Sequence, residues 1–243
     1  MVGVSTVALI ERKPTITRSL FSRYWRDVHG VMAARIPGFD CYTQYHVTPV
    51  QSGIEAFEGV AVVTYLSEAD RAGLIHSEVT QHIHRDEQNV FRRALLYNLG
   101  EGADHVLKGS MSSNDQSMFF VCANGDDTSG LIPLLQTTAT YLATYDLTVD
   151  DPANWNETDT TGRTFTTLVH GTWPNRASAI AVANNLSVAA YLADESYVMV
   201  EHGRPTAVGL RGLDAVNTIL EAQADNQLSP DVVRAIYGDI AVA

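Results

Sequence analysis

The chain has 243 residues, 45% of them hydrophobic and 18% charged, which is typical of a globular protein with a sizeable core. Its formal net charge of −12, without any Lys/Arg block, argues against binding to nucleic acid or to an anionic membrane surface. No run reaches the ~18 apolar residues of a membrane span, the N-terminus lacks a signal-peptide pattern, and two cysteines are too few for a disulfide framework. We therefore expect a cytoplasmic protein.

The first part of the chain predicts the order strand, helix, strand, strand, helix, strand, which is the ferredoxin-like order. The predicted strands are residues 4–12, 40–48, 58–65 and 105–108. The first helix opens at Thr17 and stops at Pro37-Gly38, and the second is predicted over 86–96. Ser67 is the expected N-cap of a further helical segment, with acidic residues in its first turn.

After a polar linker over 109–115, a similar order begins again. The expected strands are 117–123, 141–147, 164–169 and 197–201, and an acidic, turn-rich insertion covers 150–161. Helices are expected over 131–141, from Trp173-Pro174 onward, over 212–224, and from Ser229-Pro230 to Tyr237.

Two such passes predict an α+β fold of tandem ferredoxin-like repeats. One half would cover residues 1–110 and a divergent second half residues 116–243. A four-stranded sheet with helices on one side leaves its other face bare. We expect the two bare faces to pack together as a (pseudo-)dimeric α+β barrel.

The most specific pattern is R-K-P-T-I-T-R-S-L-F-S-R-Y-W-R-D-V-H-G, from Arg12 to Gly30. It resembles the EthD family of dimeric α+β barrel proteins, whose first strand ends near R-K-P and whose first helix carries F-x-x-Y-W-x-x-V-H. The segment from Pro37 to Val47 and the D-E-x-x-x-F pattern from Asp86 to Phe91 also resemble that family. The second half has no Y-W-x-x-V-H equivalent.

The resemblance implies the barrel fold and, more loosely, a pocket between sheet and helices for a hydrophobic or aromatic small molecule. Similar barrels include isomerases, polyketide cyclases, small monooxygenases and tandem-repeat haem proteins. The family name refers to a role in ether degradation.

His29 is the first candidate for a catalytic residue. At about 100° per residue it falls at the edge of the helix's apolar stripe, beside Trp25, from where it can reach toward the sheet. An imidazole there could act as general base or acid, the alternative being a structural histidine bonded to a backbone carbonyl. Tyr24 lies on the opposite edge and could donate to a developing oxyanion, or be a core tyrosine. Trp25 is expected to form core or pocket wall.

The second strand carries Tyr42, Gln44 and His46 on one face. In a sheet covered on both sides these polar side chains need partners, which a ligand cavity or water would provide. We take His46 as the second catalytic candidate, and Tyr42 and Gln44 with Trp25 as substrate-binding residues.

Other signals are weaker. Glu78, His82 and Asp86 are spaced by four and could bind a divalent metal on one helix, although a wet helix face is the favoured interpretation. His170 and His202 could line a second pocket, but no motif supports them. Nucleotide-binding, esterase and zinc-protease motifs are absent from the sequence, so no cofactor and no metal are expected.

The leading hypothesis is a cofactor-independent lyase or isomerase for a small hydrophobic molecule, aromatic or polyketide-like. His29 would move a proton with help from His46, and Tyr24 would stabilise developing charge. One alternative is a non-catalytic binding or accessory protein of a small-molecule degradation pathway. A third is a haem-binding enzyme, although no histidine can be singled out as its axial ligand. A homodimer is compatible with such folds.

Overall fold

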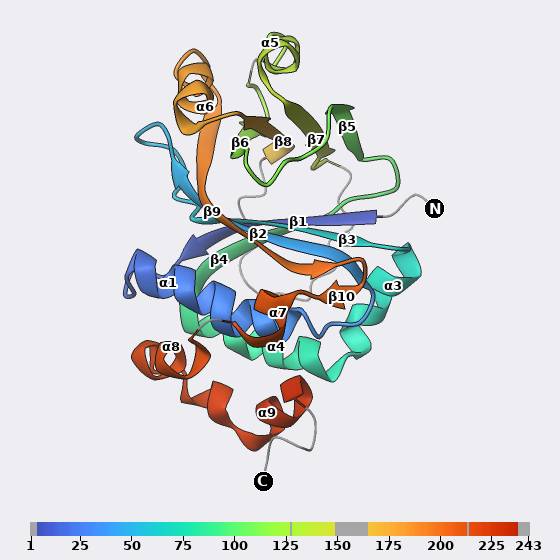
Figure 1. Ribbon diagram of the computed structural model, residues 1–243, viewed down its shortest axis with the longest axis vertical. Coiled ribbons are helices and arrows are strands. Elements are labelled where there is room, and N and C mark those ends of the chain that lie inside the picture. Colours follow the sequence, from blue (N-terminus) through green and yellow to red (C-terminus); the bar gives the residue numbers. More distant parts are fainter. Residues whose placement is uncertain (1–3, 127, 149–164, 213, 238–243) are drawn as a thin grey trace.

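The computed structural model describes residues 4–126, 128–148, 165–212 and 214–237 (Figure 1). The elements of the first half are β1 (Val4–Arg12), α1 (Arg18–Tyr24), η1 (Trp25–His29), α2 (Gly30–Ala33), β2 (Phe39–Pro49), β3 (Gly59–Tyr65), α3 (Glu68–Ala72), η2 (Gly73–His76), α4 (Glu78–Val90), β4 (Phe91–Asn98) and β5 (Asp104–Lys108). The later elements are β6 (Gln116–Ala123), α5 (Leu131–Thr138), β7 (Tyr141–Asp146), β8 (Phe165–Trp173), α6 (Arg176–Ala183), β9 (Ala189–Glu201), β10 (Arg204–Pro205), α7 (Ala207–Arg211), α8 (Ala215–Ala222), η3 (Asp225–Leu228) and α9 (Pro230–Tyr237).

The first four strands form a ferredoxin-like sheet in the antiparallel order β4-β1-β3-β2. The helices α1, η1, α2 and α4 cover one face of this sheet (Figure 1). Thr17 and Ser67 cap their helices as predicted, each accepting a hydrogen bond from the backbone N–H three residues on.

The helix predicted over 86–96 is confirmed only for residues 86–90, and the prediction for 91–96 was wrong. The helix α4 runs from Glu78 to Val90, and β4 follows it directly. Leu95 and Tyr97 pack into the interior between the two sheets, while Ala94 and Leu96 face the helices. A strand buried on both faces has no polar alternation, so its apolar run is easily mistaken for the end of a helix. The strand β5 is real, but it pairs with β7 of the second half and does not close the first sheet.

The second half repeats the topology in the order β9-β6-β8-β7, with β5 added at the edge. Its boundaries differ from those predicted: β8 extends to Trp173, α6 begins at Arg176 behind the cap Asn175, and β9 is 13 residues long. The predicted helix over 131–141 ends at Thr138. The insertion predicted over 150–161 lies outside the described residues.

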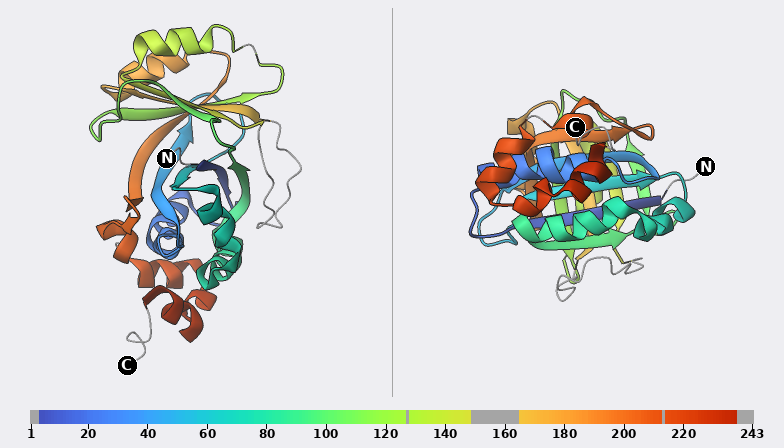
Figure 2. Two further views of the ribbon diagram at one scale, coloured as in Figure 1. Left: turned by 90° about the vertical axis from the view of Figure 1, so that its right-hand side faces the viewer. Right: turned by 90° about the horizontal axis from the view of Figure 1, so that it is seen from below.

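The strands β2 and β9 pair, so the two sheets join into one curled antiparallel sheet. Their bare faces meet in an aromatic-rich interior that includes Tyr45, Phe119 and Tyr191, with helices on the two outer sides (Figure 2). This arrangement confirms the predicted α+β fold of tandem ferredoxin-like repeats that form a barrel-type core. It follows from the burial of two apolar sheet faces against each other.

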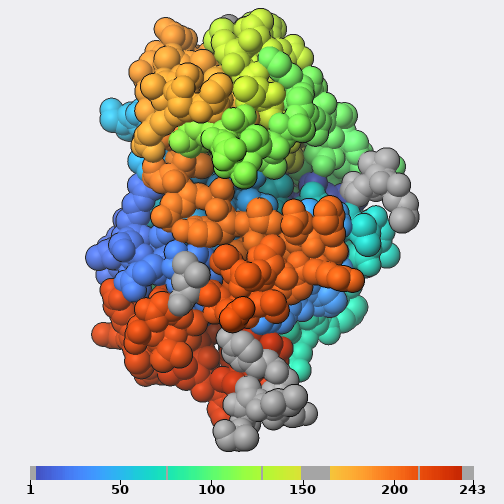
Figure 3. Space-filling view, in the orientation of Figure 1, coloured from blue at the N-terminus to red at the C-terminus, as the bar shows by residue number. Residues whose placement is uncertain are grey.

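The segment after β9 leaves the second half and packs on the helices of the first. The helix α7 contacts α2, α8 contacts α1, and α9 contacts α4. In Figure 3 this orange and red segment covers the lower part of the molecule. The division of the chain into a first half, 1–110, and a second half, 116–243, therefore remains a prediction. None of the described helices is long and apolar enough to cross a membrane.

Candidate functional site

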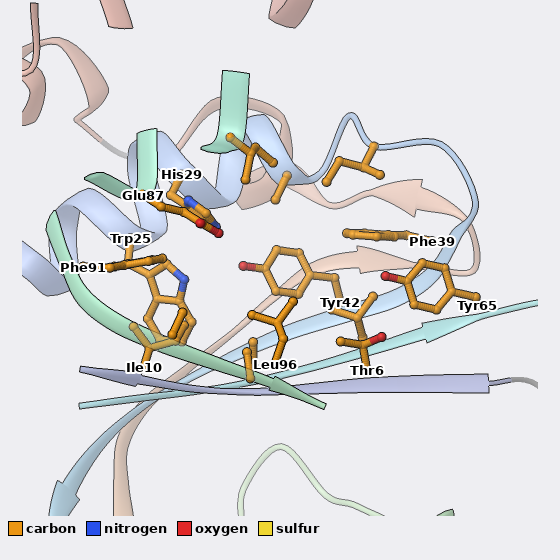
Figure 4. Close-up of a pocket in the computed structure, with 17 residues that line it drawn as sticks. Thr6, Ile10, Trp25, His29, Phe39, Tyr42, Tyr65, Glu87, Phe91 and Leu96 are labelled. Atoms are coloured by element: carbon orange, nitrogen blue, oxygen red, sulfur yellow. The ribbon is translucent and has the colours of Figure 1, made fainter. Parts of the chain in front are cut away.

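A cavity lies between the first sheet and the helices that cover it (Figure 4). The volume of the cavity that is open to the centres of water molecules is about 60 Å³. Its walls are Thr6, Ala8, Ile10, Trp25, His29, Ala33, Ile36, Phe39, Tyr42, Ala61, Val63, Tyr65, Ile83, Glu87, Phe91, Ala94 and Leu96. Most of these side chains are aliphatic or aromatic, so the cavity suits a largely apolar ligand.

The cavity is small. One buried water needs about 10–15 Å³ of such space, so the cavity corresponds to about four to six waters. That number of waters occupies roughly 120–180 Å³ as liquid, which is the size of one six-membered carbon ring with a short substituent. The volume of the cavity therefore matches that of a single-ring molecule.

His29 is held at the cavity wall by a buried carboxylate. Its Nδ1 lies 2.8 Å from Oδ2 of Asp86, and the hydroxyl of Tyr24 donates to Oδ1 of Asp86 over 2.5 Å. Asp86 is fully buried, so this short chain of hydrogen bonds is protected from water. Because a carboxylate only accepts, the proton of the neutral imidazole is held on Nδ1. The lone pair of Nε2 is left for the cavity that His29 lines.

Tyr24 itself does not line the cavity. Burial and the neighbouring Asp86 carboxylate raise its pKa far above the ordinary value, and Asn89 donates a further hydrogen bond to its oxygen. The hydroxyl proton of Tyr24 is committed to Asp86. Tyr24 therefore orients the carboxylate that orients His29, in place of the direct contact with substrate that the sequence suggested.

Glu87 is the second ionisable group in the cavity and lies next to His29 in Figure 4. Its pKa is raised to about 7, mainly by burial; the neighbouring His29 lowers this pKa and the nearby Asp86 carboxylate adds to the increase. Near neutral pH a carboxyl group of this kind is present in both its acidic and its basic form. It can therefore give or take a proton under ordinary conditions.

Trp25 and Tyr42 complete the polar end of the cavity, with their polar atoms turned toward its interior (Figure 4). Gln44 lies behind them and outside the cavity lining. Its amide nitrogen donates to the backbone carbonyl of Trp25 and to the hydroxyl of Tyr42, each over 2.8 Å. The structure thus brings together Trp25, Tyr42 and His29 at one cavity and gives Gln44 a supporting position.

His46 lies elsewhere, in correction of its expected place beside His29. It packs against the other side of Trp25, with a ring-centroid distance of 4.7 Å, and lines an open groove with Ser22 and Glu195. Its Nδ1 is 2.7 Å from the hydroxyl of Ser22. Burial lowers its pKa to about 3, with smaller contributions from nearby arginines, so the ring stays neutral and is a weak base.

The weaker candidates do not form sites. On α4, Nε2 of His82 lies 3.9 Å from Oε1 of Glu78, while the carboxylate of Asp86 is bonded to Tyr24 and His29. In the described parts of the chain, no group of three or more His, Cys, Asp or Glu side chains could hold a metal ion. In the second half, His170 is buried between the sheets, stacked on Phe119 at 4.3 Å.

Glu87 was not among the predicted site residues, and Asp86 was considered only as a possible metal ligand. The D-E-x-x-x-F pattern contained the signal, because it resembles a family segment just as the His29 motif does. Because the predicted helix began at Asp86, the prediction did not determine where these two carboxyl groups point. In the structure, α4 directs Asp86 to His29 and Glu87 to the cavity. The catalytic roles assigned to His29, His46 and Tyr24 stay predictions.

Neither a family model nor a curated protein sequence matches the chain. Solved structures do. An anthrone oxidase-like protein aligns over 85% of this chain and 97% of its own length, with a TM-score of 0.54 and 10% identity. A candidate monooxygenase from Lactobacillus acidophilus (TM-score 0.46, 9% identity, 85% of this chain and 99% of its own) and a mutant chlorite dismutase from Candidatus Nitrospira defluvii (0.39, 7%, 90% and 94%) are also similar. At such identities the similarity shows the fold alone, and that fold is the dimeric α+β barrel.

Proposed function

We propose that the protein is a cofactor-independent lyase or isomerase that moves a proton on a small, single-ring hydrophobic molecule. The observation that carries the proposal is the buried Asp86–His29 hydrogen bond behind an apolar cavity. His29 Nε2 would remove a proton from a carbon atom next to a carbonyl group, where the resulting charge is delocalised onto oxygen.

Asp86 supports His29 in this role in two ways. It holds the ring with the lone pair of Nε2 available, and its negative charge stabilises the imidazolium that forms when the proton arrives. A positioned general base of this type contributes a rate factor of about 10²–10⁴. Tyr24 donates a hydrogen bond to this carboxylate, and Asn89 donates one to the hydroxyl oxygen of Tyr24.

Glu87 would act as the partner acid. With a pKa of about 7 it is largely protonated on the acidic side of neutrality and can return a proton to another atom of the substrate. In an isomerisation that atom is a second carbon, and in an elimination it is the leaving group. The neutral acid also avoids a negative charge beside the developing enolate.

The apolar walls account for the substrate class. Ala8, Ala61 and Val63 on the sheet and Phe39 and Phe91 at the sides give the space for one ring an apolar lining. A haem macrocycle is much larger than this cavity, so the cavity does not fit haem. The motif from Arg12 to Gly30 supports an EthD-type assignment as part of this proposal.

Acetophenone is a suitable probe because it has one ring and exchangeable protons next to its carbonyl group. We expect the protein to accelerate exchange of the methyl protons in deuterated water, followed by proton NMR. His29→Gln should slow this exchange by about 10²-fold or more. The matched control is His82→Gln, a buried histidine of α4 outside the cavity lining, which should retain the full rate.

Each result decides between the hypotheses. Exchange at the wild-type rate in His29→Gln would contradict the role of the imidazole. Saturable binding of acetophenone without any exchange would contradict an enzyme of this type and favour a binding or accessory protein. Absence of acetophenone binding, measured by calorimetry, would contradict the cavity as a site for single-ring ketones.

A further inference from the structure

Two hydrogen-bond donors at the polar end of the cavity have no acceptor within the part of the chain that the structure describes. Trp25 is fully buried, and its indole Nε1 has no hydrogen-bond partner among the described residues. A buried N–H group without an acceptor costs free energy, and the great majority of such groups in native proteins are paired. The indole nitrogen faces the cavity in Figure 4, so an acceptor in the cavity can reach it.

The hydroxyl proton of Tyr42 is also free for the cavity, and Gln44 is the reason. The amide atom of Gln44 that contacts the Trp25 carbonyl must be the nitrogen, because a carbonyl oxygen can only accept. The same nitrogen lies 2.8 Å from the Tyr42 hydroxyl. The oxygen of Tyr42 therefore accepts this bond, and its own proton must point elsewhere.

The backbone around Gly30 makes this arrangement possible. The π-helical turn η1 brings the N–H of Gly30 to the carbonyl of Trp25, which also accepts from Gln44. A Cβ atom at Gly30 would lie 2.5 Å from the amide nitrogen of Gln44 and 2.9 Å from the Trp25 carbonyl oxygen. Only glycine lets Gln44 pass this close to the helix. π-Helical turns are frequent at functional sites.

The two donors converge. Figure 4 shows the indole nitrogen and the Tyr42 hydroxyl on the same side of the cavity, toward His29 and Glu87. The indole N–H is close enough to lower the pKa of Tyr42 against the upward effect of burial, although the two groups do not have hydrogen-bond geometry with each other. One acceptor oxygen between them would satisfy both.

We propose that Trp25 and Tyr42 form the oxygen-binding pair of the cavity, and that the ligand is a single-ring ketone or enone whose carbonyl oxygen accepts from both. This ligand orientation rests on the proposed function, because it turns the carbon next to the carbonyl toward His29. The pair would bind the carbonyl in the ground state and stabilise the enolate oxygen as charge develops. Gln44 and Gly30 are positioning residues for it. Tyr24, which the sequence suggested for this task, is occupied by Asp86.

The experiment measures binding and the carbonyl stretch of acetophenone labelled with ¹³C at the carbonyl. Two donors should lower the infrared carbonyl frequency on binding to the wild-type protein. Tyr42→Phe and Trp25→Phe keep a ring but lose one donor each. Each should weaken acetophenone binding by about threefold to tenfold and reverse part of the infrared shift.

The controls separate the donor from the packing. Ethylbenzene has no oxygen, so its affinity for Tyr42→Phe should stay within about twofold of wild type. Trp173→Phe removes a similarly buried indole N–H of the second half, which has no partner among the described residues and lies away from the cavity, and should change neither affinity nor frequency. If Trp25→Phe fails to fold, as judged by thermal melting, Tyr42→Phe tests the pair alone.

The outcomes distinguish this inference from the proposed reaction. An unshifted carbonyl frequency in the wild-type complex, or an unchanged affinity of Tyr42→Phe for acetophenone, would overturn the oxygen-binding pair even if proton exchange occurs. A shifted frequency without exchange would support the pair and contradict the reaction. His29→Gln should keep the infrared shift, since it leaves both donors in place.

Discussion

Replacement of Asp86 by Asn tests how the buried network controls His29. The substitution keeps the size and shape of the side chain but removes its charge and one of its two acceptors. The remaining amide oxygen can accept from Tyr24, which leaves an N–H group facing Nδ1 of His29. The imidazole must then accept at Nδ1, and its proton moves to Nε2 in the cavity. Nε2 of His29 then donates a hydrogen bond and can no longer act as a base.

The magnitude follows from the contacts. A hydrogen bond to a buried charged group is worth about 1.5–3 kcal/mol, and the Asp86→Asn variant would keep one of the two that the carboxylate accepts. We therefore expect a loss of about 1.5–3 kcal/mol in the free energy of unfolding. Proton exchange in acetophenone should fall by about 10²–10⁴-fold, the factor associated with a correctly oriented general base. Acetophenone affinity should change little, because the cavity walls are unchanged.

The assay compares exchange by NMR with unfolding in urea, and Asp27→Asn is the matched control. Asp27 is also fully buried, but it forms an ion pair with Arg26, with contacts of 2.6 and 2.7 Å, and does not line the cavity. Asp27→Asn should lower the free energy of unfolding but leave the rate of proton exchange at the wild-type value. Exchange by Asp86→Asn within a few-fold of wild type, in folded protein, would refute the claim that the carboxylate sets the state of His29.

Three further predictions concern pH and packing. Because a neutral Glu87 avoids a second negative charge beside the developing enolate, exchange should fall as pH rises through about 7, and Glu87→Gln should remove that limb of the pH–rate profile. Burial lowers the pKa of His170 to about 3 in the native state. As pH falls below about 6.5 the unfolded chain binds a proton at this residue and the native state does not, so the free energy of unfolding decreases. His170→Phe should therefore narrow the difference in unfolding free energy between pH 7 and pH 4, measured in urea, by about 3 kcal/mol; an unchanged difference would show that the native state protonates this ring. Gly30→Ala places a Cβ against Gln44 and should cost about 1–3 kcal/mol of stability and weaken acetophenone binding, whereas full stability in thermal melts would contradict the close approach.

The fold was largely predictable because its elements carry local signals. Thr17 and Ser67 are good caps, and the first helical segment ends at Ala33, four residues before the predicted stop at Pro37-Gly38. The strand β4 was missed because its residues 94–98 are buried on both faces, so nothing in their pattern distinguishes them from a buried helix. The pairing of β5 with β7 depends on contacts between the two halves, which periodicity does not encode.

The candidate site was predictable only where one element determines the geometry. The apolar stripe of the first helix placed His29 and Trp25 toward the sheet, as the structure has them. The partner of His29 comes from α4, far along the chain, and its direction depends on where that helix ends. His46 and Tyr42 share a strand face, yet the Trp25 ring separates His46 from the cavity. Such separation by one large side chain is a tertiary effect.

The most direct test of the central claim is a ¹⁵N NMR measurement of the His29 ring during titration with acetophenone. The Asp86 contact predicts a proton on Nδ1 and an unprotonated Nε2 in the neutral ring. Saturation of the cavity should then shift the Nε2 resonance while Nδ1 remains bonded to the carboxylate. A neutral ring with its proton on Nε2, or an Nε2 resonance that does not respond to bound ketone, would contradict the account.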